Sequence, residues 1–213
     1  MIYDFPGIED PIKQGDIFRG IPRVEVELSE GLSVSTETGD INTIPWEEII
    51  ANKEQAIAAI FGVSPVTAIV VSQTCDANRD PYVTLCEIVE ISEIDKGFAT
   101  DKQPKALVKE IINKNVNKPN LFYLPPDPKM AFVAKMGVDF SKTLRVSRND
   151  IENLKKNRCG RLKQVPYDHF REKLSYFFHR YAFSEWYPLN KDEIQYYEHI
   201  DTLKETDFFG WQR

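Results

Sequence analysis

The stretch VTAIVVSQTCD, residues 66–76, places an apolar run directly before five polar or reactive residues. Its apolar part is rich in β-branched side chains and predicts a buried central strand from Val66 to Gln73. The polar part has two interpretations. It either begins a hairpin loop, with Cys75 as small core filler and Asp76 as a turn residue, or it forms a site at the carboxyl end of the strand. The stretch therefore predicts where a functional site would lie, but not which reaction it would perform.

Strands are also predicted on both sides of this stretch. Residues 82–91 predict the next strand, and the turn residues between the two predict an antiparallel hairpin. Upstream, residues 14–29 predict a strand with one solvent-exposed face, because Val24, Val26 and Leu28 alternate with glutamates. The first half of the chain is therefore expected to be rich in β structure.

The remaining elements are predicted from breakers, caps and apolar spacing. Pro45 predicts the start of a helix that continues to Phe61 and ends at Gly62, and Ser147 with Asp150 has the spacing of a capping box for a short helix. Gly160 is expected to end that helix or the turn after it. The other expected elements are a helix over 105–115 and short strands over 121–124, 130–134 and about 142–146.

The most regular helical pattern begins at Pro166. Apolar residues follow at spacings of three and four, and the resulting stripe is expected to be core or interface. Farther on, the tail ends in FFGWQR and is expected to pack on the body or on a partner, because exposed aromatic clusters are costly. The stripe consists of Tyr167, Phe170, Leu174, Phe177, Phe178 and Tyr181. Together the patterns predict an α+β protein with a single domain over residues 1–213, a strand-rich core at about 13–148 and C-terminal helices at about 148–213.

Composition limits the class of protein. A chain of 213 residues with 42% apolar residues can bury one sizeable core. It has no positively charged start followed by an apolar stretch, and no run approaches the roughly 20 apolar residues that cross a bilayer. Three cysteines without a CxxC pair indicate neither a zinc ribbon nor a disulfide framework. We expect a soluble, cytoplasmic protein in a reducing compartment, with no membrane partner.

Charge is distributed unevenly along the chain. Residues 1–60 carry a net charge of -8, residues 61–183 carry +6 and residues 184–213 carry -4. The basic residues concentrate in residues 142–163, which we call the basic segment. This segment either contacts phosphates or is a solvated face balanced by the acidic ends. Its cations are Lys142, Arg145, Arg148, Lys155, Lys156, Arg158, Arg161 and Lys163, against Asp150 and Glu152.

Several chemistries receive little support from the sequence. A thiol nucleophile at Cys75 would need a base, and His169, His179 and His199 all lie far away in the sequence. The run DANRD, residues 76–80, alternates oxygen ligands but lacks the glycine and distal glutamate of a calcium loop. Phosphate-binding glycine loops, HExxH and GxSxG are absent from the sequence. We therefore predict neither a metal nor another cofactor.

Three short motifs carry a resemblance to a known family. QGDIFRGIP (14–22), TAIVVSQTCD (67–76) and YVTLCEIVEI (82–91) occur in the order typical of PemK/MazF proteins, and NDIENLKKNRCGRL (149–162) is similar to the helix and Arg-containing turn that follow. The resemblance implies an SH3-like antiparallel β-barrel, here with inserted helices and a C-terminal helical region. It also implies homodimerisation and metal-independent cleavage of single-stranded RNA.

One departure from the family favours binding over cleavage. The family's Arg-Pro pair, whose arginine supports proton transfer and phosphate charge, is replaced here by Val66 and Thr67. Arg19, Arg79 or Arg158 would have to substitute for it in space. The first hypothesis is therefore a non-catalytic barrel that binds RNA, DNA or an acidic partner. Its binding residues would be the basic segment and a cleft containing Asp16, Ser72, Gln73, Thr74, Cys75 and Asp76.

Two further hypotheses remain open. The chain is alternatively a toxin-type endoribonuclease, with Ser72, Thr74, Asp76 and Arg158 as catalytic candidates. It is otherwise a regulatory or structural subunit that associates with itself or with another protein through its aromatic C-terminal helix and tail. The salt dependence of binding separates phosphate contacts from an aromatic interface.

Overall fold

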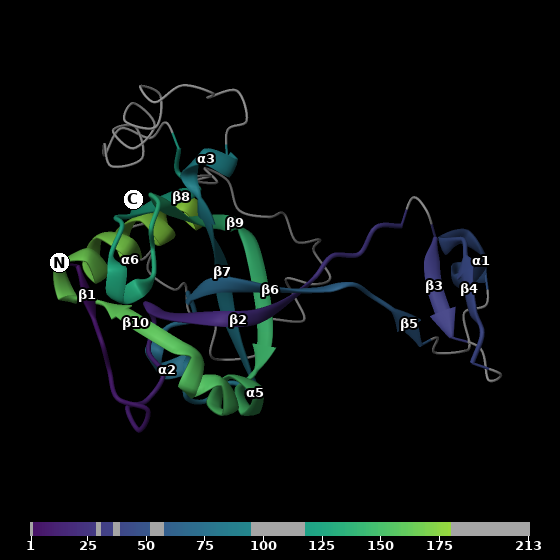
Figure 1. Cartoon of the computed structure of the whole chain (residues 1–213), viewed down its shortest axis with the longest axis horizontal. Helices are drawn as coiled ribbons and strands as arrows, with labels where there is room; N and C mark the ends of the chain where they lie inside the picture. The colour runs from purple at the N-terminus through teal and green to yellow at the C-terminus, as the bar shows by residue number, and fades with distance from the viewer. Residues whose placement is uncertain (1, 29–30, 36–38, 52–57, 95–117, 180–213) are drawn as a thin grey trace, which may run out of the picture.

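The computed structural model describes residues 2–28, 31–35, 39–51, 58–94 and 118–179 (Figure 1). The described strands form one seven-stranded sheet and one three-stranded sheet, and every strand pairing is antiparallel. Short helices and one long helix accompany them. The predicted α+β class is therefore confirmed.

The seven-stranded main sheet has the predicted central strand in its middle. That strand is β6 (Val63–Val70), and it pairs with β7 (Tyr82–Glu90), which confirms the hairpin. The sheet also contains elements outside residues 13–148, since β10 pairs with β2 and β1 pairs with β10 at the sheet edge. In spatial order its strands are β1 (Tyr3–Asp4), β10 (Arg158–Leu162), β2 (Asp16–Val24), β6, β7, β9 (Met136–Ser147) and β8 (Leu121–Leu124).

The main sheet is not closed, so the predicted SH3-like barrel is not confirmed. β1 and β8 are its edges, and no strand pairing joins them in the described part of the chain. The predicted strand over 130–134 is also wrong: the chain turns through the 3₁₀-helix η1 (Pro128–Met130) and forms only an isolated bridge between Asp127 and Phe132. Side chains still approach across the opening, because the Tyr3 hydroxyl donates to the Pro125 carbonyl at 3.0 Å.

Helices cover the two faces of the main sheet. On one face, Phe170 and Leu174 of α6 (Gln164–His179) are buried against strand residues, and Phe170 meets Phe140 edge-on with ring centroids 5.6 Å apart. On the other face lie α2 (Thr74–Ala77) and α5 (Arg148–Asn153), which contribute Ala77 and Ile151 to a second core. The aromatic stripe is thus confirmed as core at Phe170 and Leu174, whereas Phe178 is 61% exposed and Tyr181 lies outside the described residues.

The capping residue predicted at one helix start is confirmed, whereas the predicted helix end at a glycine is wrong. Ser147 caps α5 as predicted, its hydroxyl accepting from the Asp150 N–H at 3.1 Å, and η2 (Leu154–Asn157) follows. Gly160 does not end a helix but lies within β10, where a side chain would collide with Met130. A short helix, α3 (Ile91–Ile94), follows β7, and the predicted helix over 105–115 lies outside the described residues.

Residues 25–62 leave the main sheet as an insertion between β2 and β6, which we call the arm. In Figure 1 it lies apart from the main sheet. Its described elements are β3 (Leu32–Ser35), β4 (Ile41–Ile44), α1 (Trp46–Ala51) and β5 (Ala59–Ile60), with sheet order β4-β3-β5.

The arm corrects two predictions. The described helix after Pro45 is α1, and Ile60 belongs to a strand, so the expected helix does not continue to Phe61. β2 ends at Val24, and Val24, Val26 and Leu28 are all exposed. These valines and the leucine do not face the core, because they lie where the chain leaves the main sheet.

None of the described helices is long and apolar enough to cross a membrane.

Candidate functional site

A cleft of about 910 Å³ opens where the N-terminal segment, the SQTCD turn and the start of α6 meet. Thr74 is the residue of the SQTCD turn that lines it. Three cationic side chains face one acidic side chain around this space. The complete lining is Ile2, Asp4, Lys13, Gln14, Thr74, Arg161, Leu162, Lys163, Gln164, Val165, Pro166 and Tyr167.

Gln14 ties the walls of the cleft together. Its backbone N–H donates to the Thr74 hydroxyl at 3.3 Å, and its amide nitrogen donates to the Val71 carbonyl at 2.7 Å. Its amide oxygen accepts from the Tyr167 hydroxyl at 3.1 Å. Because Gln14 is only 6% exposed, these bonds form in a region of low water access and hold the turn, the loop before β2 and α6 in fixed positions.

The backbone turn after Gln14 requires glycine. Gly15 has φ +90°, a left-handed conformation that glycine adopts without steric cost. A Cβ at this position would lie 3.2 Å from the Tyr167 ring. The glycine of the QGDI motif therefore allows the turn between Gln14, which forms hydrogen bonds in the cleft wall, and Asp16, which pairs with Arg158 and Arg161.

Behind the cleft, Asp16 holds two arginines of β10. Its carboxylate is fully buried and pairs with Arg158 at 3.0 Å and with Arg161, whose Nη2 donates to it at 2.9 Å. Arg161 Nε also donates to the carboxylate, and the backbone N–H of Lys13 adds a fourth hydrogen bond at 3.0 Å. A buried carboxylate needs such partners, because removing its water otherwise costs several kcal/mol.

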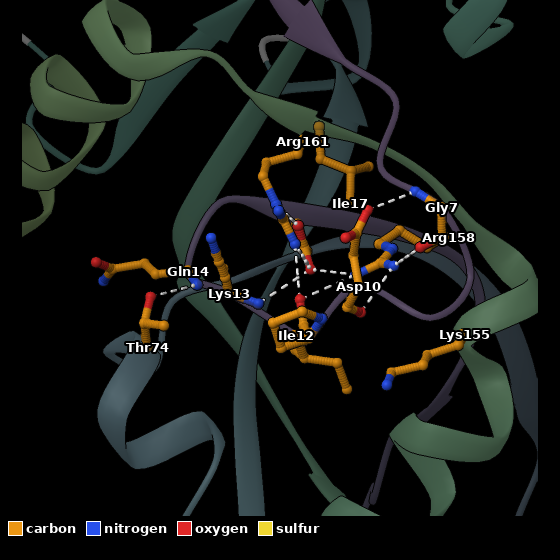
Figure 2. A network of polar contacts seen from close by, with 12 residues as sticks. Gly7, Asp10, Ile12, Lys13, Gln14, Ile17, Thr74, Lys155, Arg158 and Arg161 are labelled. Atoms are coloured by element: carbon orange, nitrogen blue, oxygen red, sulfur yellow. Dashed lines mark hydrogen bonds and ion pairs between the residues drawn. The ribbon is translucent and has the colours of Figure 1, made fainter.

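The same arginines fasten the N-terminal loop. Figure 2 shows both guanidinium groups turned toward the loop that contains Gly7, Asp10 and Ile12. Arg158 donates to the carbonyls of Gly7, Asp10 and Pro11, and Arg161 donates to the Pro11 carbonyl at 2.8 Å. Two cations thus share the buried Asp16 carboxylate, and the charges of Asp10 and Asp4 also act on Arg161.

The two arginines differ in their access to the cleft. The side chain of Arg158 is only 1% exposed and does not line the cleft, whereas that of Arg161 is 15% exposed and does. Burial alone would lower the pKa of Arg161, but the hydrogen bond and charge of Asp16 outweigh it and raise that pKa. Arg161 therefore presents a permanent positive charge beside the cleft.

The charges around the cleft favour an anion. Lys13 and Lys163 are exposed and join Arg161, while Asp4 is the one acidic lining residue. The first turn of α6 also lies in the wall and carries the partial positive charge of a helix N-terminus. Within the described part of the chain, its free backbone donors are those of Gln164 and Val165, because Pro166 has no N–H and the Tyr167 N–H donates to the Lys163 carbonyl. With the Thr74 hydroxyl, these groups supply the donors that a phosphate oxygen accepts from.

The other residues of SQTCD do not line the cleft. The Ser72 hydroxyl accepts from the Thr84 N–H at 2.8 Å and so joins the turn to β7. Gln73, Cys75 and Asp76 are exposed, and the Cys75 thiol lies 3.4 Å from the Asp76 carboxylate. The motif therefore combines a structural residue, Ser72, with a lining residue, Thr74.

The cations of the basic segment are dispersed. Only Arg161 and Lys163 line the cleft. Arg145 stacks on the Tyr82 ring at 4.2 Å, and Lys155 pairs with Glu152 at 2.6 Å. Lys142 and Lys156 are exposed, while Nε and Nη2 of Arg148 are buried without a hydrogen-bond partner among the described residues.

Among the described residues no histidine lines the cleft, and the Asp4 carboxylate is the acidic lining group that could accept a proton. His169 is exposed on α6 and is not a lining residue, and His199 lies outside the described residues. Burial raises the pKa of the Cys86 thiol to about 12, and it also raises that of Cys159, so both thiols stay protonated at neutral pH. Within the described ranges no cluster of His, Cys, Asp and Glu has the geometry to hold a metal ion.

Three arginines were considered as substitutes for the arginine of the family's Arg-Pro pair, and the structure shows where each one lies. Arg19 donates to the Met130 carbonyl, Arg158 is buried on Asp16, and Arg79 is exposed at the end of the SQTCD turn. None of these three lines the cleft. Arg161, which was predicted only as a binding residue, is the arginine that lines the cleft together with Thr74.

Sequence reasoning missed Lys13, Gln14 and the first turn of α6 as cleft residues. Lys13 and Gln14 immediately precede the GDI motif, so their proximity to that motif was the available signal. No protein-family model matches this chain, and a search of curated proteins finds no significant match.

Proposed function

We propose that the protein is a binding module whose cleft takes a phosphate of a single-stranded nucleic acid. The observation that carries the proposal is the grouping of Lys13, Arg161 and Lys163 around a cleft of about 910 Å³ with a single acidic side chain in its wall. Phosphate contacts by lysine and arginine supply most sequence-independent affinity for nucleic acids. Arg161 and the first turn of α6 would position the phosphate, and the lysines would add charge.

The arrangement favours binding over cleavage. RNA cleavage without a metal requires a group that takes the proton of the attacking hydroxyl and a cation that stabilises the phosphorane charge. Arg161 meets the second requirement. The Thr74 hydroxyl already accepts a hydrogen bond from Gln14, and a hydroxyl is a weak base. The Asp4 carboxylate lines the cleft as well, but it already accepts the Phe5 N–H at 3.0 Å.

Endoribonuclease activity is the second candidate function, because Thr74 and Arg161 line the same cleft. It would agree with the PemK/MazF resemblance, with Arg161 taking the part of the arginine of the Arg-Pro pair. The finer fold assignment, a PemK/MazF-like SH3-like barrel, belongs to this proposal as well. The antiparallel main sheet supports it, and the open edges at β1 and β8 weigh against full closure.

The test combines gel retention and cleavage of mixed single-stranded RNA at low and moderate salt. The Lys13→Ala/Lys163→Ala variant removes two exposed lining cations, and Lys142→Ala/Lys156→Ala removes the same charge from exposed positions that do not line the cleft. We expect the first variant to lose most retention and the second to keep it, with intact RNA in every lane.

Other outcomes would change the assignment. Cleavage that disappears in Thr74→Ala would establish the nuclease. Retention lost only in Lys142→Ala/Lys156→Ala would move the nucleic acid to the outer part of the basic segment. Absence of both retention and cleavage would overturn the nucleic-acid proposal and leave an acidic protein as the ligand to seek.

A further inference from the structure

The arm buries very little of its own apolar surface. Within its described residues, Val34 is the one apolar side chain below one-tenth exposed, and α1 has no buried residue. A three-stranded sheet with one short helix normally needs a covered apolar face for stability. The described part of the arm therefore has a sheet and a helix but almost no buried apolar core.

The apolar side chains of the arm and its root are instead exposed. Ile41 is 64% exposed and Val63 is 60% exposed, and the arm's one tryptophan is 37% exposed. Clusters of exposed apolar side chains on this scale mark an interaction surface. The exposed set is Val24, Val26, Leu28, Ile41, Trp46, Ile50, Ile60, Phe61 and Val63.

The arm is also the acidic pole of the molecule. Residues 24–63 contain eight Asp or Glu and one Lys, a net charge of -7, so the rest of the chain carries +1. The basic segment, with eight Lys or Arg against Asp150 and Glu152, has a net charge of +6. The two segments thus have nearly equal and opposite charge in the sequence. In the folded chain the exposed cations of the basic segment are Lys142, Arg145 and Lys156, together with Lys163 at the cleft.

The main sheet directs the arm away from its own body. β2 and β6 remain paired through Pro22–Pro65 and Val24–Val63, and the arm begins where this pairing ends. Figure 1 shows the arm separated from the main sheet by this extended hairpin. The arm's surface is therefore presented outward.

We propose that the arm docks on the basic segment of a second copy of this chain, and that two copies exchange arms in a closed dimer. The complementary charge is present in the same chain, and a two-fold exchange satisfies both poles of both copies without leaving an open end. The exposed cations Lys142, Arg145 and Lys156 would face the partner's acidic arm, and the arm's apolar residues would lose their contact with water. These three cations do not line the cleft, so this dimer does not depend on the function proposed for the cleft.

Charge exchange tests the proposal by sedimentation velocity over a wide range of protein concentration. Glu47→Lys/Glu48→Lys reverses exposed charges on α1, and Lys142→Glu/Arg145→Glu reverses exposed charges on β9. We expect a dimer for the unchanged protein, monomers for each reversed variant, and a dimer again when all four changes are combined. Glu9→Lys/Glu172→Lys changes the charge equally at exposed positions outside both poles and should remain dimeric.

A second variant keeps the test independent of helix stability, because Glu47 and Glu48 lie in the first turn of α1, where acidic residues favour a helix. Val26→Ser/Ile41→Ser removes exposed apolar groups without changing charge, and we expect it to weaken the dimer. A monomeric unchanged protein, a dimer that survives the charge reversals, or failure of the fourfold variant to restore the dimer would each overturn the proposal.

Discussion

Asp16 joins β2, near the start of the chain, to β10, which lies more than 140 residues later in the sequence. It belongs to the GDI motif that the sequence singled out, yet its partners Arg158 and Arg161 lie 142 and 145 residues away. Local patterns cannot reveal such a pairing, because nothing in a basic run tells which cations turn inward. The sequence predicted the importance of these three residues, but not that they stabilise one another.

Removing the carboxylate should destabilise the protein strongly. Asp16→Ala leaves the buried Arg158 without its counter-ion, and breaking a buried ion pair in this way costs about 3–5 kcal/mol. Urea denaturation measures the loss. Glu9→Ala removes an exposed carboxylate from the same N-terminal segment and should change the free energy of unfolding by about 0.5 kcal/mol or less. Equal effects of the two changes would show that the Asp16 network contributes no stability.

Within SQTCD, neighbouring residues should respond differently to alanine. Ser72→Ala leaves the Thr84 N–H without its acceptor, which should lower the free energy of unfolding by about 1–3 kcal/mol. Asp76→Ala changes an exposed side chain and should cost about 0.5 kcal/mol or less. Thermal unfolding of both variants compares them directly, and a larger loss for Asp76→Ala would contradict the assigned roles.

At the scale of elements, short-range signals were the more reliable ones. The Ser147 cap and Asp150 lie three residues apart, and Phe170 and Leu174 follow one helical stripe, so their sequence spacing contains the information. β10 was missed because its strand character depends on pairing with β1 and β2, which lie far away in the sequence. Val24 and Val26 were predicted on a half-buried strand because alternation alone does not show where a strand leaves its sheet, and β2 ends at Val24.

Lys173 gives α6 a pH-dependent stability. Burial lowers its pKa from the usual 10.5 to about 8 in the folded protein. Between these values the unfolded chain binds more protons than the folded protein, so this residue's contribution to stability rises as the pH increases from about 8 toward 10.

The consequence is a stability difference that depends on pH. Lys173→Met should be more stable than the unchanged protein at pH about 7, where the lysine is charged in both states, and the difference should shrink by pH about 10. Denaturant unfolding at the two pH values measures it. The conservative Lys173→Arg remains charged throughout and should show no such convergence.

The arm should be separable from the main sheet. Because Val24 pairs with Val63, an Asn-Gly turn can replace residues 25–62 and close β2 and β6 as a two-residue hairpin. We expect the shortened protein to keep the melting temperature of the main sheet within a few degrees and to be monomeric. A collapse of the near-ultraviolet circular dichroism signal would show that the arm contributes to the main core.

At the scale of the whole molecule, the sequence predicted the α+β class but not whether the sheet closes. The α+β class followed from strand patterns early in the chain and helical patterns later, whereas barrel closure depends on whether the edge strands meet. The cleft was predicted only in part: Thr74 and Arg161 were named, but Lys13 and Gln14 were not. Its walls come from distant segments, so only the folded arrangement brings them together.

The salt dependence of RNA binding tests the central claim most directly. Fluorescence anisotropy with a labelled single-stranded RNA gives the affinity at several salt concentrations, and each phosphate contact contributes a slope of about -0.7 in log K against log salt. We expect Lys13→Ala/Lys163→Ala to bind more weakly and to reduce the steepness of the slope by about 1.4. An unchanged slope and affinity in this variant would contradict the assignment of the cleft as a phosphate-binding site.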